Sequence, residues 1–158
     1  MEYAIRDARR EDLPDVMRLI RELAEFEREL DEVETSVAEL ERDGFGESPA
    51  FHCFIAESSG EVIGIALVYW RYSTWKGKTL HLEDLIVTQS VRGKGIGNAL
   101  LAEVVRYGKA HGCRRIQWEV LDWNENAIRF YQSKGALILR DWHLVHLRKD
   151  AIQAYPLD

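Results

Sequence analysis

The spacing of hydrophobic residues changes between two periods along the chain, and each period predicts a different kind of element. Apolar residues recur at the helical spacing of about 3.6 in residues 11–30 and again in residues 96–111. A shorter helix is predicted to begin at Thr35 or Ser36, because hydroxyl side chains suit a helix start, and to end near Gly44.

Strand-like runs alternate with these helices, and a further helix is predicted from its cap Asn124 to about residue 134. The predicted strands are residues 3–8, 51–57, 62–72, 79–88, 115–122 and 137–148. Their order predicts an α/β (α+β) fold, in which a mixed, mostly antiparallel sheet of about six to seven strands is flanked by helices. Residues 79–88 and 115–122 are expected to be splayed parallel strands joined by a helix.

Length and composition indicate an ordinary globular protein. The chain has 158 residues, which predicts a single domain over residues 1–158. No window approaches 18 consecutive apolar residues, so neither a membrane span nor a membrane partner is expected. Only Cys53 and Cys113 are present, so no disulfide framework is expected and a reducing cytoplasm is the predicted location.

The distribution of charge narrows the class of partner. The net charge is −6, which argues against nucleic acid. Acidic residues gather in residues 25–43, either as a solvated helix face or as a field that attracts a cationic substrate. The five histidines show no metal-ligand spacing, so no metal is expected, and His81 is interpreted as an ordinary strand residue.

A glycine-rich basic loop, Arg92-Gly93-Lys94-Gly95-Ile96-Gly97, lies between a predicted strand and a predicted helix. Glycines let successive backbone N–H groups point into one concavity, and the helix start adds partial positive charge. This arrangement suits a pyrophosphate, although a flexible turn is the plainer interpretation. The Gly-Lys-Ser/Thr ending of nucleotide-triphosphate loops and the spacing of the dinucleotide fingerprint are both missing.

The loop and the element after it resemble the GNAT family of N-acetyltransferases. Arg92, Gly95 and Gly97 match the family's Gln/Arg-x-x-Gly-x-Gly/Ala pattern. The segment WNENAIRFYQSKGA resembles its Asn-x-x-Ala-x-x-Phe-Tyr-x-x-x-Gly pattern, with these residues in register: Asn124, Ala127, Phe130, Tyr131 and Gly135. Two spaced motifs in the right order make the resemblance specific.

The resemblance extends to one branch of the family over nearly the whole chain. The segments ELAEFE, DGFGE, YSTWKG, LEDLIV, RGKGIG, LDWNE and FYQSKGA are similar to those of diamine acetyltransferases of the spermidine/spermine type and of their thialysine-acetylating relatives. The resemblance implies a GNAT fold, acetyl-coenzyme A as the acetyl donor, a primary amine of a small molecule as the acceptor, and a homodimer.

The same resemblance implies two catalytic residues: Glu83 as the base, working through water, and Tyr131 as the general acid at the coenzyme sulfur. Glu83 and Asp84 lie together in a predicted core strand, where burial is expected to raise the pKa of a carboxylate. A strand-end bulge with two solvated acids is the alternative. In a regular strand Asp84 would point to the face opposite Glu83.

The resemblance also implies two sets of binding residues. Those expected to bind the coenzyme are Leu85, Ile86, Val87, Arg92, Gly93, Lys94, Gly95, Ile96, Gly97, Asn98, Asn124, Asn126, Ala127 and Tyr131. Those expected to bind the acceptor are Phe26, Glu27, Ser73, Thr74, Trp75, Glu83 and Glu119. Trp75 could equally be a loop anchor, and Glu119 is an extra acid where the polyamine enzymes tend to be apolar.

Ser73 and Thr74 stand where the polyamine enzymes carry Asp-Pro, which favours a lysine-like amine such as thialysine. Three alternatives remain: a polyamine acetyltransferase, a peptide or protein N-acetyltransferase, and a non-catalytic module that binds acetyl-coenzyme A. Both Glu83 and Tyr131 are present, which favours the enzyme.

Overall fold

A computed structural model describes residues 1–157, which divide into two compact units, Met1–Glu119 and the part from Val120 onward. The first unit holds a five-stranded sheet in the order β1-β2-β3-β4-β5. Its strands are β1 (Ala4–Asp7), β2 (His52–Ser58), β3 (Glu61–Ser73), β4 (Gly77–Val87) and β5 (Ile116–Gln117). Neighbours from β1 to β4 are antiparallel, and β5 pairs with β4 in parallel. The mixed sheet is thus confirmed, with five strands instead of six to seven.

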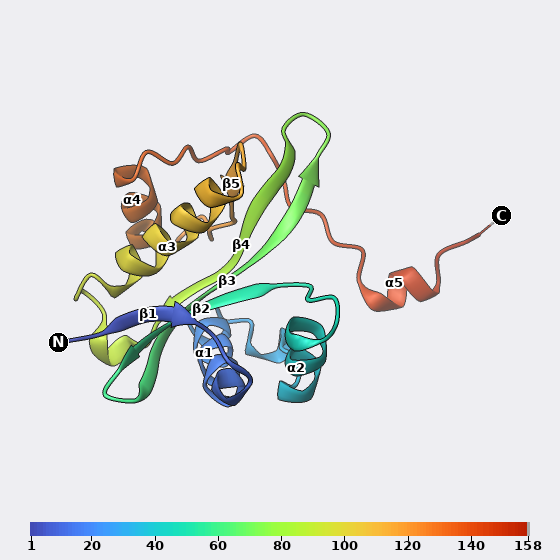
Figure 1. Cartoon of the computed structure of the whole chain (residues 1–158). Helices are drawn as coiled ribbons and strands as arrows, with labels where there is room; N and C mark the ends of the chain where they lie inside the picture. The colour runs from blue at the N-terminus through green and yellow to red at the C-terminus, as the bar shows by residue number, and fades with distance from the viewer. Residues whose placement is uncertain (158) are drawn as a thin grey trace. The chain divides into compact units, whose positions relative to one another are not determined.

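Helices cover both faces of this sheet (Figure 1). On one face lie α1 (Leu13–Phe26) and α2 (Val37–Phe45), and on the other lies α3 (Ile96–Ala110). Ser36 caps α2 as predicted, and its hydroxyl accepts a hydrogen bond from the Glu39 N–H. Short 3-10 helices connect these elements: η1 (Arg10–Asp12), η2 (Leu30–Glu32) and η3 (Gln89–Val91).

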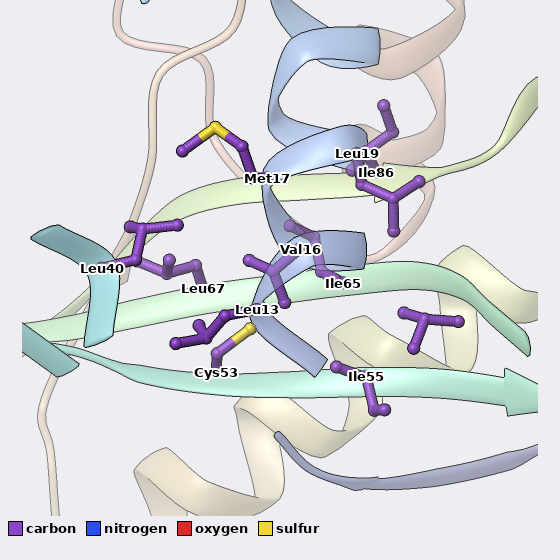
Figure 2. Packing of buried hydrophobic residues seen from close by; sticks show 11 residues of the cluster. Leu13, Val16, Met17, Leu19, Leu40, Cys53, Ile55, Ile65, Leu67 and Ile86 are labelled. Carbon is purple, nitrogen blue, oxygen red and sulfur yellow. The ribbon is translucent and has the colours of Figure 1, made fainter. Parts of the chain in front are cut away.

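The main core lies between α1 and the sheet. Leu13, Val16 and Leu19 occur at helical spacing and are fully buried. Figure 2 shows these side chains above Ile55, Ile65 and other residues from β2, β3 and β4. We name this side of the sheet the α1 face and the opposite side the α3 face.

One irregularity in the pairing of β3 with β4 determines which polar side chains lie on the α1 face. Leu67 pairs with Asp84, whereas the next residue, Val68, pairs with Leu82. Glu83 therefore has no partner across the ladder and is the extra residue of a β-bulge. A bulge shifts the alternation of side chains by one position. The residues after it therefore point to the opposite face from the one they would have in a regular strand.

Two predicted strands differ from the structure. Residues 115–122 contain only the two-residue β5, and residues 137–148 form no strand, although they are rich in apolar side chains. A strand exists only through its ladder partners, so an apolar segment is not sufficient by itself. The parallel pairing of β4 with β5 ends at His81 and Gln117, which agrees with the expected splaying.

The second unit contains α4 (Glu125–Ser133) and α5 (Lys149–Gln153), of which α5 was not expected from the sequence. The Asn124 side-chain oxygen accepts a hydrogen bond from the Ala127 N–H and starts α4 as predicted. Gly135 ends this segment with a φ of +86°, a conformation that favours glycine. Within residues 1–157 no helix has the length and apolar character needed to cross a membrane. The prediction of one domain stays a prediction.

Candidate active site

The bulge at Glu83 brings polar residues from two strands to the α1 face. Asp84 lies opposite Leu67, a core residue of the α1 face. Tyr69 is two positions beyond Leu67 along β3, so it shares that face, and His81 lies opposite Tyr69. His81 and Asp84 are three residues apart in β4 and still point the same way. The expectation for a regular strand, in which Asp84 points away, does not hold here.

Glu83 faces this cluster from an exposed position. Its carboxylate Oε2 lies 3.4 Å from His81 Nε2, and the Tyr69 hydroxyl donates a hydrogen bond to the same carboxylate. The interaction with His81 is the main cause that lowers the pKa of Glu83, and it outweighs the opposing effect of burial. The raised pKa expected for Glu83 is therefore wrong. A partner's N–H stabilises the charged form of this carboxylate.

The carboxyl group with a raised pKa is instead that of the next residue, Asp84. Burial, with the nearby negative charges of Glu83 and Glu27 as further causes, raises the pKa of Asp84 to about 7. Burial, followed by the charge of Glu29, also raises the pKa of Glu27. Carboxylates that repel one another in a partly dry site cannot all ionise easily. Asp84 is thus the carboxyl group whose proton is exchanged near neutral pH.

His81 and Tyr69 are site residues that the sequence did not reveal. His81 is only 2% exposed, and its ring centroid lies 4.9 Å from that of Tyr69. His81 Nε2 also lies 3.9 Å from Glu119 Oε2, so two carboxylates flank this histidine. A histidine two positions before an acid in a strand was the available signal, because such residues share a face. Among the described residues, no group of three His, Cys, Asp or Glu side chains is arranged to hold a metal ion.

The acceptor residues predicted from the sequence fall into two places. Phe26 and Glu27 lie at the C-terminal end of α1, and Glu27 is close enough to Asp84 to raise its pKa. Together with Glu83, Asp84 and Glu119, Glu27 makes this region strongly acidic.

The second group of predicted acceptor residues lies at the tip of the β3–β4 hairpin, away from the acidic cluster. Ser73 and Thr74 belong to the turn between β3 and β4, and the Ser73 hydroxyl oxygen accepts hydrogen bonds from the N–H groups of Trp75 and Lys76. Trp75 is 77% exposed. Gly77, which closes the turn, lies about 20 Å along β4 from Glu83, since each strand residue advances about 3.3 Å. Within one copy of the chain these residues do not join the acidic cluster.

The glycine loop has the backbone that a pyrophosphate site requires. Gly93 and Gly95 have φ values of +78° and +82°, which other residues rarely adopt. Gly95 is the residue before α3, and its carbonyl accepts the hydrogen bond from Ala99 N–H. The N–H groups of the first helical residues, Ile96 to Asn98, precede the intrahelical ladder and point out of the helix start. Such N–H groups and the helix dipole bind anions well.

Arg92, in contrast, turns toward the protein and anchors the start of this loop. Its Nε donates to the Val87 carbonyl oxygen over 2.8 Å, and its guanidinium lies 5.3 Å from the Phe26 ring centroid. The Glu22 carboxylate of α1 accepts hydrogen bonds from the Thr88 hydroxyl and the Gln89 N–H, both over 2.8 Å. These contacts tie the loop to the end of α1.

The outer edge of β4 completes the part of the site in the first unit. β5 pairs only with Leu80 and His81, while β4 continues to Val87. Within the described residues, Leu85, Ile86 and Val87 therefore have no strand partner on that side. An extended ligand can add to such an edge through backbone hydrogen bonds.

The remaining candidates lie in the second unit, on or beside α4. The Asn124 side chain caps this helix, and Asn126 Oδ1 accepts a hydrogen bond from Arg129 over 2.7 Å. Tyr131 is buried, and its ring centroid lies 5.3 Å from that of Phe130. The motif residues Asn124, Ala127 and Tyr131 thus share one short helix and its cap.

Comparisons with known proteins define the class. A model of the acetyltransferase (GNAT) family matches residues 3–136. Thialysine N-epsilon-acetyltransferase of Bos taurus is 40% identical over 160 residues, which cover 94% of each chain. The chain therefore belongs to the acetyltransferase (GNAT) family, and it is an enzyme of acetyl transfer.

Two further comparisons concern the branch of the family and the fold of the chain. Spermidine/spermine N(1)-acetyltransferase-like protein 1 of Homo sapiens is 39% identical over 160 residues, covering 95% of this chain and 23% of that protein. An integron cassette protein of V. cholerae has a solved structure that matches with a TM-score of 0.78 and 23% identity, covering 97% and 96% of the two chains. The latter similarity supports the fold alone.

Proposed function

We propose that this enzyme transfers an acetyl group from acetyl-coenzyme A to a primary amine of a small, cationic molecule. The observation that carries the proposal is the acidic α1 face, where the bulge at Glu83 gathers Glu83, Asp84 and Glu27 beside the free edge of β4. Negative charge attracts an alkylammonium, and carboxylates can take the proton that it must lose.

The residues present suit the coenzyme. Its pyrophosphate would be held by the loop from Gly93 to Asn98 through backbone N–H groups, with the charge of Lys94 nearby. The edge of β4 from Leu85 to Val87 would pair with the pantetheine arm. Arg92 would act by fixing this loop. The proposal extends to Asn124, Asn126 and Ala127 of the second motif. When bound, acetyl-coenzyme A supplies the activated acetyl thioester.

Deprotonation of the amine is the first task of the protein. An alkylammonium has a pKa near 10.4, so little free amine exists at neutral pH. We assign the base to Glu83, which accepts the proton through a water molecule. Glu83 is ionised at neutral pH, because His81 and Tyr69 stabilise its carboxylate. Asp84, with a pKa of about 7, changes the charge beside Glu83 when it gains or loses its proton near neutral pH.

Two further tasks fall to other groups. A backbone N–H of β4 within residues 85–87 would donate a hydrogen bond to the acetyl carbonyl oxygen as negative charge develops there. The Tyr131 hydroxyl would donate its proton to the sulfur of the departing thiolate. A group used only in the transition state changes turnover and leaves binding nearly unaffected.

For the acceptor we propose a lysine-like amine such as thialysine. The support is the similarity to thialysine acetyltransferases. The hydroxyls of Ser73 and Thr74 can hydrogen-bond an amino acid head group, but they would do so from the second copy of the proposed homodimer, because in one copy they lie far from Glu83. A polyamine is the second candidate, supported by the similarity to spermidine/spermine N(1)-acetyltransferase-like protein 1.

We also propose that the enzyme is a homodimer and works in a reducing cytoplasm. The C-terminal segment presents many large apolar side chains to solvent: Leu137, Leu139, Trp142, Leu144, Val145, Leu147, Ile152, Tyr155 and Leu157. Extended apolar exposure of this kind marks an interaction surface. Cys53 and Cys113 are free thiols, as a reducing compartment allows.

The test is an acetylation screen with acetyl-coenzyme A and a panel of thialysine, lysine, spermidine, spermine and short peptides, in which released thiol is measured. We expect thialysine to give the highest kcat/KM, and the Glu83→Gln variant to lose activity that is partly recovered at higher pH. A tenfold preference for spermidine would transfer the chain to the polyamine branch. Turnover of peptides alone would contradict a small-molecule acceptor.

A further inference from the structure

His81 occupies an unusual position for a histidine in the acidic cluster. It is almost fully buried in β4, yet its Nε2 faces the carboxylates of Glu83 at 3.4 Å and Glu119 at 3.9 Å. Its other nitrogen, Nδ1, is buried and has no hydrogen-bond partner within residues 1–157. The ring is held in place by Tyr69, whose centroid lies 4.9 Å away.

These contacts determine which nitrogen carries the proton in the neutral ring. A proton on Nδ1 would leave a buried donor without an acceptor and would turn the Nε2 lone pair toward two carboxylates. Both arrangements are costly. A proton on Nε2 instead points a donor at the carboxylate oxygens and leaves only a bare nitrogen unpaired. His81 therefore presents an N–H group to Glu83.

We propose that His81 is the positioning residue of the catalytic base, holding the Glu83 carboxylate on the α1 face through its Nε2–H, with the Glu119 carboxylate 3.9 Å from the same nitrogen. This inference rests on the proposed function, because it assumes that Glu83 takes the amine proton. It adds a residue that acts through Glu83 and does not itself touch the substrate.

The position of Glu83 explains why it needs such support. Its side chain is 51% exposed and extends from a bulge, where no residue lies opposite it in the ladder. An exposed glutamate samples several rotamers, and fixing one of them costs side-chain entropy. Two donors on a rigid sheet, the His81 imidazole and the Tyr69 hydroxyl, restrict the carboxylate to one place. A buried ring is a better anchor than a mobile surface side chain.

The same contact determines how Glu83 responds to pH. His81 lowers the pKa of Glu83, so the carboxylate stays charged at a lower pH than it would alone. The other titratable groups that surround the pair are Tyr69 on β3, Asp84 on β4, Glu27 at the end of α1 and Glu119 after β5. Without His81, the acid limb of kcat/KM should move to higher pH.

Kinetics of two variants test this role. His81→Phe keeps a ring of similar size but removes both nitrogens, whereas His81→Gln keeps a polar N–H donor. We expect His81→Phe to lower kcat at least tenfold, to leave the affinity for acetyl-coenzyme A unchanged, and to move the acid limb to higher pH. His81→Gln should have a higher kcat than His81→Phe, and its acid limb should lie closer to that of the wild type.

His52→Gln is the matched control, because His52 Nε2 also pairs with a carboxylate, at 2.9 Å from Asp7, but on the α3 face. This variant should keep the pH profile of the wild type. Equal losses in His81→Phe and His81→Gln would mean that the ring merely fills space, and would overturn the proposal. A folded His81→Phe enzyme with wild-type kcat and pH profile would overturn it as well.

A spectroscopic measurement decides the contact without relying on turnover. Nitrogen-15 NMR of the imidazole rings should show the Nε2–H form of His81 at alkaline pH. Glu83→Gln should shift the His81 signals and leave those of His52 unchanged. Observation of the Nδ1–H form, or of no shift, would refute the His81–Glu83 contact even if the enzyme is active. An inactive wild type with the expected shift would instead refute the proposed function and retain the contact.

Discussion

Asp84 lies directly opposite Leu67 in the β3–β4 ladder, so its carboxyl group is on the same face as the apolar core beneath α1. In a regular strand it would point to the α3 face, and the one-residue bulge at Glu83 reverses this. The partly buried location, followed by the negative charges of Glu83 and Glu27, raises the pKa of Asp84 to about 7.

The first prediction concerns the pH dependence of stability. The pKa of Asp84 is higher in the folded state than its ordinary value of 3.8, so between about pH 4 and pH 7 the folded state binds more protons there than the unfolded state does. The contribution of Asp84 to stability should therefore fall as pH rises through this range. Asp84→Asn removes the effect, and it should be more stable than the wild type at pH 8 by about 1 kcal/mol or more.

Urea unfolding of both proteins at pH 5 and pH 8 measures the difference. All other titrating groups are shared, so most of their contributions cancel in the comparison. If the free energies of unfolding of the two proteins differ by the same amount at both pH values, Asp84 ionises as it does in water and the prediction is wrong.

The second prediction concerns the glycine loop. Gly95→Ala adds a methyl group at a residue with φ of +82° beside the proposed pyrophosphate site. We expect weaker binding of acetyl-coenzyme A, measured by calorimetry, because the loop must change shape to relieve the strain. Gly60→Ala is a matched control, since Gly60 has the same φ of +82° but lies in the β2–β3 turn. Equal affinities in both variants would contradict a binding role for Gly95.

The third prediction concerns the anchor between α1 and the loop. Glu22→Gln weakens the hydrogen bonds that the carboxylate accepts from Thr88 and Gln89. Hydrogen bonds to a charged group contribute about 1.5–3 kcal/mol. We expect the KM for acetyl-coenzyme A to rise several-fold, with a smaller change in kcat.

Asp15→Asn provides the control for general effects on α1, because Asp15 pairs with Arg18 on the same helix and makes no contact with the loop that the structure records. If both variants have the same KM, Glu22 does not organise the coenzyme site.

The fourth prediction concerns Tyr131. Tyr131→Phe preserves the volume of a buried ring and removes its hydroxyl. If the hydroxyl protonates the leaving sulfur, kcat should fall by about 10² or more while the affinity for acetyl-coenzyme A changes little. Tyr107→Phe, in the aromatic cluster of α3, should keep wild-type kcat. Retention of over half of the turnover, with chemistry shown to be rate-limiting, would remove Tyr131 from this role.

The fifth prediction concerns assembly. Light scattering at micromolar concentration should give a mass of twice 18.3 kDa, because the exposed apolar residues of the C-terminal segment favour burial against a second copy. Replacing Leu144 and Leu147 by serine should shift the mass toward the monomer. A wild-type monomer under these conditions would contradict the homodimer.

The sequence by itself was sufficient for the elements whose signals are local. The 3.6 spacing of Leu13, Val16 and Ile20 is visible without any partner, and so is the capping pair of Ser36 with Glu39. The glycine loop before α3 could be recognised for the same reason, because closely spaced glycines favour positive φ values wherever the loop lies. Motif spacing in turn was sufficient to indicate the family.

Only the tertiary structure decided the geometry of the acidic face. A bulge is a mismatch between two strands, so neither β3 nor β4 alone reveals that Glu83 is the extra residue. Since one inserted residue moves the next side chain to the opposite face, the bulge also decides where Asp84 is buried and which carboxyl group has the raised pKa. The contact of His81 with Glu119 depends likewise on the alignment of β5 with β4, which is a long-range contact. Strand pairing is non-local, and for that reason the apolar residues within 137–148 could not show by themselves that this segment forms no strand.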